Sequence, residues 1–234
     1  MSWTVHNDDG LTAMRQASGW LFDLDNTLYP ASCRLFDQID ERMGSFIMGL
    51  FKVGLDEAKH IQKTYFYEYG TTLNGLMEKH DITPDAFLDY VHDIDVTPVD
   101  PHPDLGAAIT ALPGRKAIYT NGTVQHAENV LDRLGIGHCF DGVFDIVAAD
   151  FEPKPKRNGY EAALDHFGFE ATRTVMVEDI ARNLVPAKEL GLATLLVPND
   201  YAWAGPAADR FKADDTAHAI DVVTHDLKGF LQEI

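Results

Sequence analysis

Two aspartates, Asp23 and Asp25, carry the most specific chemical signal in this sequence of 234 residues. They follow the apolar run Trp20-Leu21-Phe22, and in an extended chain a spacing of two puts both side chains on the same side. Two neighbouring carboxylates do not both ionise freely unless a cation neutralises one, so the pair invites a metal ion. One carboxylate can then be a nucleophile while the other, kept protonated, acts as acid and later as base. A strand-end turn is the alternative interpretation.

Two phosphate-binding candidates follow later in the chain. Thr120-Asn121 comes directly after an apolar run, and a hydroxyl beside backbone N–H groups at a helix start can hold phosphate oxygens. The alternative is a simple helix N-cap. Lys154 begins a basic island that ends at Arg157, and it can cancel charge on a carboxylate nucleophile and on a phosphoryl group. The alternative is a solvated basic surface.

A second pair of acids, Glu178-Asp179, follows the apolar run Val175–Val177. Hard divalent cations such as Mg2+ bind carboxylate oxygens, so Asp179 together with Asp23 can supply a magnesium site. The alternative is an acidic N-cap on the next helix. Each of the four motifs is weak alone, but four in order, each after a predicted strand, form a strong pattern.

The elements that must position these residues alternate between strand and helix. Short apolar runs predict buried strands, and helical periodicity follows over residues 124–134 and 160–167. This alternation predicts an α/β fold, a Rossmann-like parallel sheet core flanked by helices, in which ligands bind beyond the carboxyl ends of the strands. The predicted strands are residues 20–22, 117–119, 144–148, 175–177 and 193–197.

One long interval, residues 31–114, has no convincing strand. An apolar stripe of helical period runs from Leu35 to Leu50, and three more helical segments follow, near residues 56–69, 72–80 and 84–94. So long a loop is implausible inside a compact domain. The sequence therefore predicts an α-helical domain at 31–114, inserted into an α/β domain made of residues 1–30 and 115–234.

In this order, the four motifs resemble motifs one to four of the haloacid dehalogenase superfamily of phosphohydrolases, and the insert falls where that superfamily carries a helical cap. The resemblance implies that Asp23 is a nucleophile that forms an aspartyl-phosphate, and that Asp25 protonates the leaving oxygen and then activates water. It implies that Thr120 and Lys154 hold the phosphoryl group. Thr27 and Asn121 are expected to bind substrate. The motif-one stretch is Asp23-Leu24-Asp25-Asn26-Thr27.

The same resemblance implies a magnesium cofactor. Mg2+ would be held by Asp23, the backbone carbonyl of Asp25, and Asp179, with Glu178 assisting. The dehalogenases themselves lack an acid at the position of Asp25 and need no Mg2+. The presence of Asp25 therefore favours phosphoryl chemistry.

Two further stretches resemble the pyrimidine 5′-nucleotidase branch: Tyr29-Pro30 after motif one, and Tyr65–Gly70 in the insert. This resemblance implies a pyrimidine nucleoside 5′-monophosphate as substrate. Tyr65 and Tyr69 lie one helical turn apart, so they could stack on a base or simply form the core of the insert. Thr72 and Asn74 could read the base or the ribose.

Several other functions stay open. The chain could be a phosphoglycolate or sugar-phosphate phosphatase, or a phosphomutase of the β-phosphoglucomutase kind that returns the phosphoryl group to its substrate. A binding or regulatory protein on the same scaffold is a third possibility, against which the intact catalytic residues argue. The sequence leaves monomer and homodimer equally open.

The composition of the chain limits the kinds of partner that it is expected to bind. The chain has 37 acidic against 19 basic residues, a formal net charge of −18, which repels nucleic-acid polymers and anionic membranes. The N-terminal residues lack the pattern of a signal peptide, and the longest apolar runs are far shorter than the roughly 20 residues of a membrane span. With only two cysteines, a disulfide framework is not expected. We therefore expect a cytoplasmic protein whose partner is a small phosphomonoester.

Overall fold

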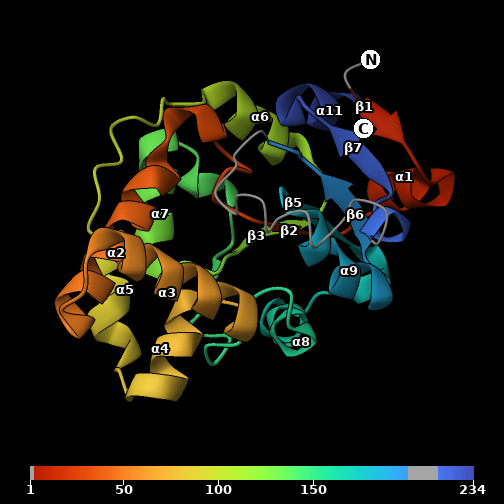
Figure 1. Cartoon of the computed structure of the whole chain (residues 1–234). Coiled ribbons are helices and arrows are strands. Elements are labelled where there is room, and N and C mark those ends of the chain that lie inside the picture. Colours follow the sequence, from red (N-terminus) through yellow and green to blue (C-terminus); the bar gives the residue numbers. More distant parts are fainter. Residues whose placement is uncertain (1–2, 200–215) are drawn as a thin grey trace. The chain divides into compact units, whose positions relative to one another are not determined.

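The structure is a computed structural model that describes residues 3–199 and 216–234 (Figure 1). The chain divides into two compact units, and each is described by itself below. The first, which we call the α/β unit, contains Met1–Ser32 together with Val99–Ile234. The second, which we call the helical unit, contains Cys33–Pro98.

The described residues of the α/β unit form one seven-stranded sheet with the order β1-β7-β6-β5-β2-β3-β4. All neighbouring strands are parallel except β1 and β7, which are antiparallel. The predicted α/β class with a parallel core sheet is therefore confirmed. The strands are β1 (Trp3–Val5), β2 (Gly19–Phe22), β3 (Arg115–Tyr119), β4 (Val143–Phe144), β5 (Thr174–Glu178), β6 (Ala193–Leu196) and β7 (Val222–Thr224).

The register of the central strands determines where the polar motifs meet. In this register, Phe22 of β2 lies opposite Ile118 of β3 and Val177 of β5. The three strands consequently end at the same edge of the sheet. The residues that follow them are brought together there, as expected for ligand sites at the carboxyl ends of parallel strands.

The helices of the α/β unit have recognisable ends. In α7 (Val124–Leu134), the Thr123 side chain caps the first turn by accepting from the backbone N–H of His126, and the helix ends at Gly135 in the left-handed region. The next helix, α8 (Arg157–Phe167), ends in the same way at Gly168. The other helices among the described residues of this unit are α1 (Asp8–Arg15), α6 (Pro103–Ala111), α9 (Ala181–Glu189) and α11 (Leu227–Glu233).

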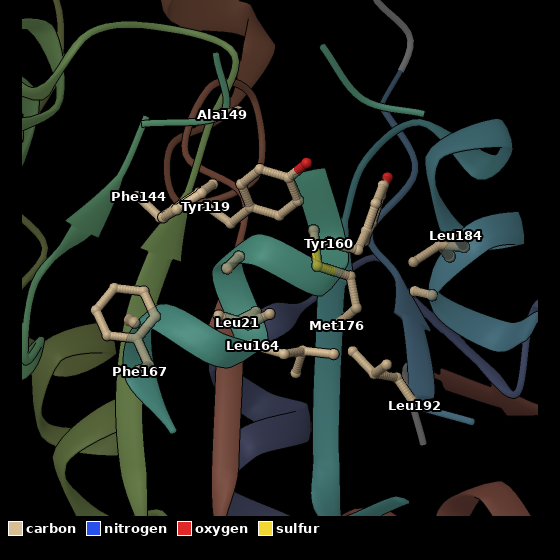
Figure 2. Close-up of a cluster of buried hydrophobic side chains, with 13 residues drawn as sticks. Leu21, Tyr119, Phe144, Ala149, Tyr160, Leu164, Phe167, Met176, Leu184 and Leu192 are labelled. Carbon is tan, nitrogen blue, oxygen red and sulfur yellow. The ribbon is translucent and has the colours of Figure 1, made fainter. Parts of the chain in front are cut away.

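A buried hydrophobic cluster joins α8 to the sheet (Figure 2). Tyr160 and Leu164 of α8 lie with Leu21 of β2, Tyr119 of β3 and Met176 of β5. The rings of Tyr119 and Tyr160 meet edge to face, with their centroids 5.0 Å apart. This packing fixes the helix that follows Lys154 against the strands that precede the other motifs.

The helical unit contains four helices, as the apolar periodicity predicts. They are α2 (Leu35–Phe51), α3 (Leu55–Tyr69), α4 (Thr72–His80) and α5 (Pro84–His92). Helix α3 packs against α2 and α4, and α2 packs against α5. Their buried apolar side chains include Ile39, Ile47, Leu76 and Phe87.

Three features differ from the expectations. The helical unit ends at Pro98 rather than 114, because α6 buries Leu105 and Ile109 and packs against α11 of the α/β unit. The strand expected at 144–148 is only Val143–Phe144, because the Asp145 side chain accepts from the backbone N–H groups of Val124 and Ala148 and turns the chain. The short strands β1 and β7 were not predicted.

Among the described residues, no helix has the length and apolar character that crossing a membrane requires.

Candidate active site

Asp23 lies at the exit of β2 and is buried, with 6% of its surface exposed. Its backbone N–H donates to the carbonyl of Val177 at 2.9 Å, which continues the pairing with β5 by one residue. Asn26 has a φ of 61°, a left-handed turn that asparagine tolerates, and Thr27 then donates its hydroxyl to Asp23 Oδ2 at 2.9 Å. Thr27, expected to bind substrate, therefore holds the expected nucleophile.

Lys154 links three strand ends through one ammonium group. Its Nζ donates to Asp23 Oδ1 at 2.6 Å, to Glu178 Oε2 at 2.7 Å, and to the carbonyl of Tyr119 at 3.1 Å. An ammonium has three N–H donors, and all three are used. Burial by itself lowers the pKa of Lys154, but the charges of Asp23 and Glu178 outweigh it and raise that pKa. Lys154 thus contacts the expected nucleophile directly.

Three carboxylates form a group that could hold a metal ion. Asp23, Glu178 and Asp179 each offer an oxygen within 4.8 Å of the others. Burial, followed by the charge of Glu178, raises the pKa of Asp23 to about 7. Burial and the charges of Glu178 and Asp23 raise the pKa of Asp179 well above its ordinary value. Lys154 alone does not neutralise this group, and an all-oxygen donor set suits a hard divalent cation.

The two carboxylates after β5 have different surroundings. Glu178 is 1% exposed, and its oxygens accept from Lys154 and, at 3.2 Å, from the backbone N–H of Ile180. Asp179 is more accessible, and its Oδ2 accepts from Asn199 Nδ2 at 2.6 Å. Asp179 is therefore the better placed of the two to ligate a cation. Asn199 follows β6 and belongs to none of the four motifs.

Asp25 faces different partners from Asp23. Its Oδ1 accepts from the hydroxyl of Tyr29 at 2.6 Å and lies 2.8 Å from His126 Nε2. Burial opposes protonation of His126, but the charge of Asp25 and the hydrogen bond to it are stronger and raise the pKa of the imidazole. His126 is 101 residues from Asp25 in sequence, and no spacing pattern connects the two.

Thr120 and Asn121 follow β3 but perform different tasks. Thr120 is 1% exposed, and its Oγ1 accepts from the backbone N–H of Gly122 at 2.9 Å, so its own proton stays available to donate. The Asn121 amide holds the backbone of Lys154, accepting from its N–H at 2.8 Å and donating to its carbonyl at 3.5 Å. Asn121, expected to bind substrate, therefore positions the lysine loop.

The aromatic candidates of the helical unit pack on one another. The rings of Tyr65 and Tyr69 have centroids 5.7 Å apart, which shows that they share one face of α3. The Tyr65 hydroxyl is hydrogen-bonded to His80 Nε2 at 2.5 Å, and its ring covers Gly75. Lys79 Nζ lies 5.5 Å from the centre of the Tyr69 ring.

Thr72 and Asn74 are engaged in the turn between α3 and α4. Thr72 is 3% exposed and donates its hydroxyl to the carbonyl of Gln62 at 3.2 Å. The backbone N–H of Asn74 donates to Thr71 Oγ1 at 3.1 Å, and its amide reaches the carbonyl of Tyr69 at 3.5 Å. These contacts hold both residues at the start of α4, and their expected role in reading the base or the ribose stays a prediction.

Two curated proteins match most of the chain. The chain is 28% identical over 195 residues to a protein named glyceraldehyde 3-phosphate phosphatase from Methanocaldococcus jannaschii, covering 76% of this chain and 84% of that protein. It is 26% identical over 203 residues to phosphate metabolism protein 8 of Saccharomyces cerevisiae, covering 79% of this chain but only 63% of that longer protein.

The solved structures agree on the fold. A haloacid dehalogenase-like family hydrolase from Streptococcus pneumoniae superposes with a TM-score of 0.60 at 16% identity, covering 94% of this chain and 99% of that one. The sequence pattern described as "Hydrolase: haloacid dehalogenase-like hydrolase" matches residues 19–191, which include Asp23, Thr120, Lys154 and Asp179. The match covers most of the chain, and the chain belongs to the haloacid dehalogenase-like hydrolases.

Proposed function

We propose that the chain is a Mg2+-dependent phosphohydrolase that acts on small phosphomonoesters through an aspartyl-phosphate. The observation that carries this proposal is the position of Asp23, buried and hydrogen-bonded to Lys154 beside two further carboxylates. A carboxylate that is oriented on both oxygens and lies next to a fixed cation is suited to attack a phosphoryl group.

The reaction proceeds in two steps. An oxygen of Asp23 bonds to phosphorus, the bond from phosphorus to the leaving oxygen breaks, and Asp25 gives that oxygen its proton. Asp25 then takes a proton from water as the water oxygen attacks the phosphoryl group, which releases phosphate and restores Asp23. The Thr120 hydroxyl donates to a phosphoryl oxygen throughout.

The carboxylates of Asp23 and Asp179 and the backbone carbonyl of Asp25 would hold Mg2+, with Glu178 beside them. A bound Mg2+ neutralises charge where an anionic substrate must approach anionic side chains. Lys154 already contacts Asp23 and Glu178, so it keeps the nucleophile oriented for the incoming phosphoryl group.

For the leaving group we propose a pyrimidine nucleoside 5′-monophosphate, on the resemblance of Tyr29-Pro30 and of Tyr65–Gly70 to the nucleotidase branch. Tyr69 is the better candidate for stacking on a base, since the hydroxyl and ring of Tyr65 are engaged with His80 and Gly75. A phosphorylated sugar or triose is the second candidate. It is favoured by the 28% identity to a protein named glyceraldehyde 3-phosphate phosphatase.

A phosphate-release assay with the full chain and Mg2+ tests the proposal, using UMP, CMP, AMP, glyceraldehyde 3-phosphate, phosphoglycolate and hexose phosphates. We expect release, with the highest kcat/KM for UMP or CMP. Absence of release from every compound would contradict the phosphatase, and conversion of a hexose phosphate without phosphate release would indicate a mutase. A higher kcat/KM for glyceraldehyde 3-phosphate would replace the nucleotide by the second candidate.

Two variants refine the assay. Asp23→Asn keeps the size of the side chain but removes the nucleophile, and we expect turnover to fall by at least roughly 1,000-fold while the far-UV spectrum is retained. Tyr69→Ala should raise KM for UMP more than KM for a small aryl phosphate, because only the nucleotide offers a base to stack on. Tyr90→Ala, at a 39% exposed tyrosine of α5, is the matched control for the second variant.

A further inference from the structure

The Asp25 carboxylate is held on one oxygen by two side chains from different parts of the α/β unit. The Tyr29 hydroxyl reaches Oδ1 at 2.6 Å from within the same loop, and His126 Nε2 lies 2.8 Å from Oδ1 at the start of α7. No sequence pattern assigned a function to His126, and Tyr29 served there only as part of a resemblance. Their convergence on a single oxygen needs a physical explanation.

Both partners are themselves firmly placed. The side chains of Tyr29 and His126 are almost completely buried, with 2% and 1% of their surfaces exposed. The backbone N–H of His126 donates to the N-cap hydroxyl of Thr123 at 3.2 Å, and that of Leu28, just before Tyr29, donates to the carbonyl of Leu24 at 3.0 Å. Asp25 keeps 16% of its side chain exposed, so a partly accessible acid is held by two buried groups.

Resting on the phosphohydrolase proposed above, we propose that Tyr29 and His126 are positioning residues that fix the Asp25 carboxylate for proton exchange with the leaving oxygen and then with water. A general acid must lie within hydrogen-bond reach of the atom that it protonates. Two contacts to one oxygen restrict rotation of the carboxylate about its Cα–Cβ and Cβ–Cγ bonds. A displacement of only about 1 Å costs on the order of 100-fold in rate.

A purely structural role is the competing explanation, since buried hydroxyl and imidazole groups need hydrogen-bond partners in any protein. The two roles differ in how the rate depends on the leaving group. An alkoxide is a poor leaving group and needs the proton from Asp25, whereas p-nitrophenolate leaves without one. Misplacing Asp25 must therefore slow the reaction of an alkyl phosphate more than that of p-nitrophenyl phosphate. The ratio of the kcat/KM values for the two substrates measures this difference.

The test uses Tyr29→Phe, which removes one hydroxyl and keeps the ring, and His126→Leu, which removes the imidazole. We expect kcat/KM for the best alkyl phosphate found in the substrate assay to fall about 10-fold to 100-fold, and for p-nitrophenyl phosphate to fall much less. His126→Gln restores an N–H donor near the position of Nε2, so it should recover part of the loss. Tyr90→Phe and His138→Gln, at exposed positions, are the matched controls.

The outcomes separate this inference from the function on which it rests. Equal losses for both substrates, or losses that His126→Gln fails to relieve, would overturn the positioning role while leaving the phosphatase intact. A wild-type chain that releases phosphate from neither substrate would overturn the phosphatase itself, and this inference with it. If His126→Leu does not fold, the ratio of the two kcat/KM values measured for Tyr29→Phe decides whether the positioning role holds.

Discussion

Individual residues of the site serve mainly to control charge. Three carboxylates lie around the single ammonium of Lys154, and burial together with mutual repulsion raises the pKa values of Asp23 and Asp179. The protein therefore holds an excess of negative charge at a place where a phosphate must bind. That excess is understandable as preparation for a divalent cation, which removes the repulsion when it binds.

One prediction follows for stability of the chain without divalent cations. With a pKa of about 7 when folded and near 4 when unfolded, Asp23 binds a proton more tightly in the folded chain. Between these pH values the folded state carries more protons, so the free energy of unfolding should fall as pH rises from about 4 to about 7. Urea titrations in EDTA should show a steeper decrease for wild type than for Asp23→Asn. The reverse order would contradict the assignment.

A second residue-scale prediction concerns Asn199. Its amide donates to Asp179 Oδ2 at 2.6 Å, and groups that orient a ligating carboxylate typically contribute 10-fold to 100-fold in metal affinity. Asn199→Ala should raise the Mg2+ concentration for half-maximal activity by roughly tenfold, with little change in kcat at saturating Mg2+. Asn129→Ala, at an exposed residue of α7, is the control. Unchanged magnesium dependence would show that Asn199 does not orient a magnesium ligand.

Sequence patterns predicted the members of the site that belong to motifs, but not the residues that support them. Asp23, Thr120 and Asp179 lie within two residues of the end of a predicted strand, so local patterns were enough to find them. Lys154 was chosen from a basic run because that run resembles a motif of the family. His126 and Asn199 contact these motifs only through the tertiary fold, at separations of 101 and 20 residues. Without an observable spacing rule, such contacts cannot be deduced from one sequence.

At the scale of elements, length decided what could be predicted. Strands inside the parallel sheet read as apolar runs, and the helices of residues 35–92 carry apolar stripes over several turns. The three-residue strands β1 and β7 are too short to show a period. Helix α6 was not predicted, and its residues were assigned to the helical insert because no local pattern shows on which surface a segment packs.

The edge of the sheet depends on Asp221, just before β7. This 1% exposed carboxylate accepts from Asn7 at 2.7 Å, from Lys188 of α9 at 2.5 Å, and from the backbone N–H of Thr194 in β6 at 3.0 Å. Asp221→Ala removes these three hydrogen bonds and leaves their donors without this acceptor. We expect the free energy of unfolding to fall by about 2–4 kcal/mol in urea titrations. Asp165→Ala, at an exposed site on α8, should cost far less.

At the scale of the whole molecule, the net charge of −18 affects stability and substrate binding differently. Mutual repulsion of the acidic side chains destabilises the compact state and is screened by salt. It does not argue against a phosphate substrate, because the positive charges that matter would be local, from Lys154 and a bound cation.

Screening gives a prediction for thermal unfolding. In EDTA, raising KCl from low concentration to about 1 M should raise Tm by several degrees, since roughly 1 kcal/mol corresponds to about 2–4 °C for a chain of this size. Choline chloride at the same ionic strength should act similarly, because screening depends on charge rather than on the identity of the cation. A Tm that stays constant or falls in both salts would contradict a dominant role for repulsion.

The position of β2 between β3 and β5 also determines at which stage of chain synthesis the site can form. Lys154 donates to Asp23 after β2, to Tyr119 in β3, and to Glu178 at the end of β5, so the constellation needs chain segments made at very different times during synthesis. A nascent chain that ends between residues 154 and 178 holds Asp23 and Lys154 but lacks the two carboxylates Glu178 and Asp179. We therefore expect phosphatase activity to arise only late in translation, and truncated chains that end before β5 to be inactive.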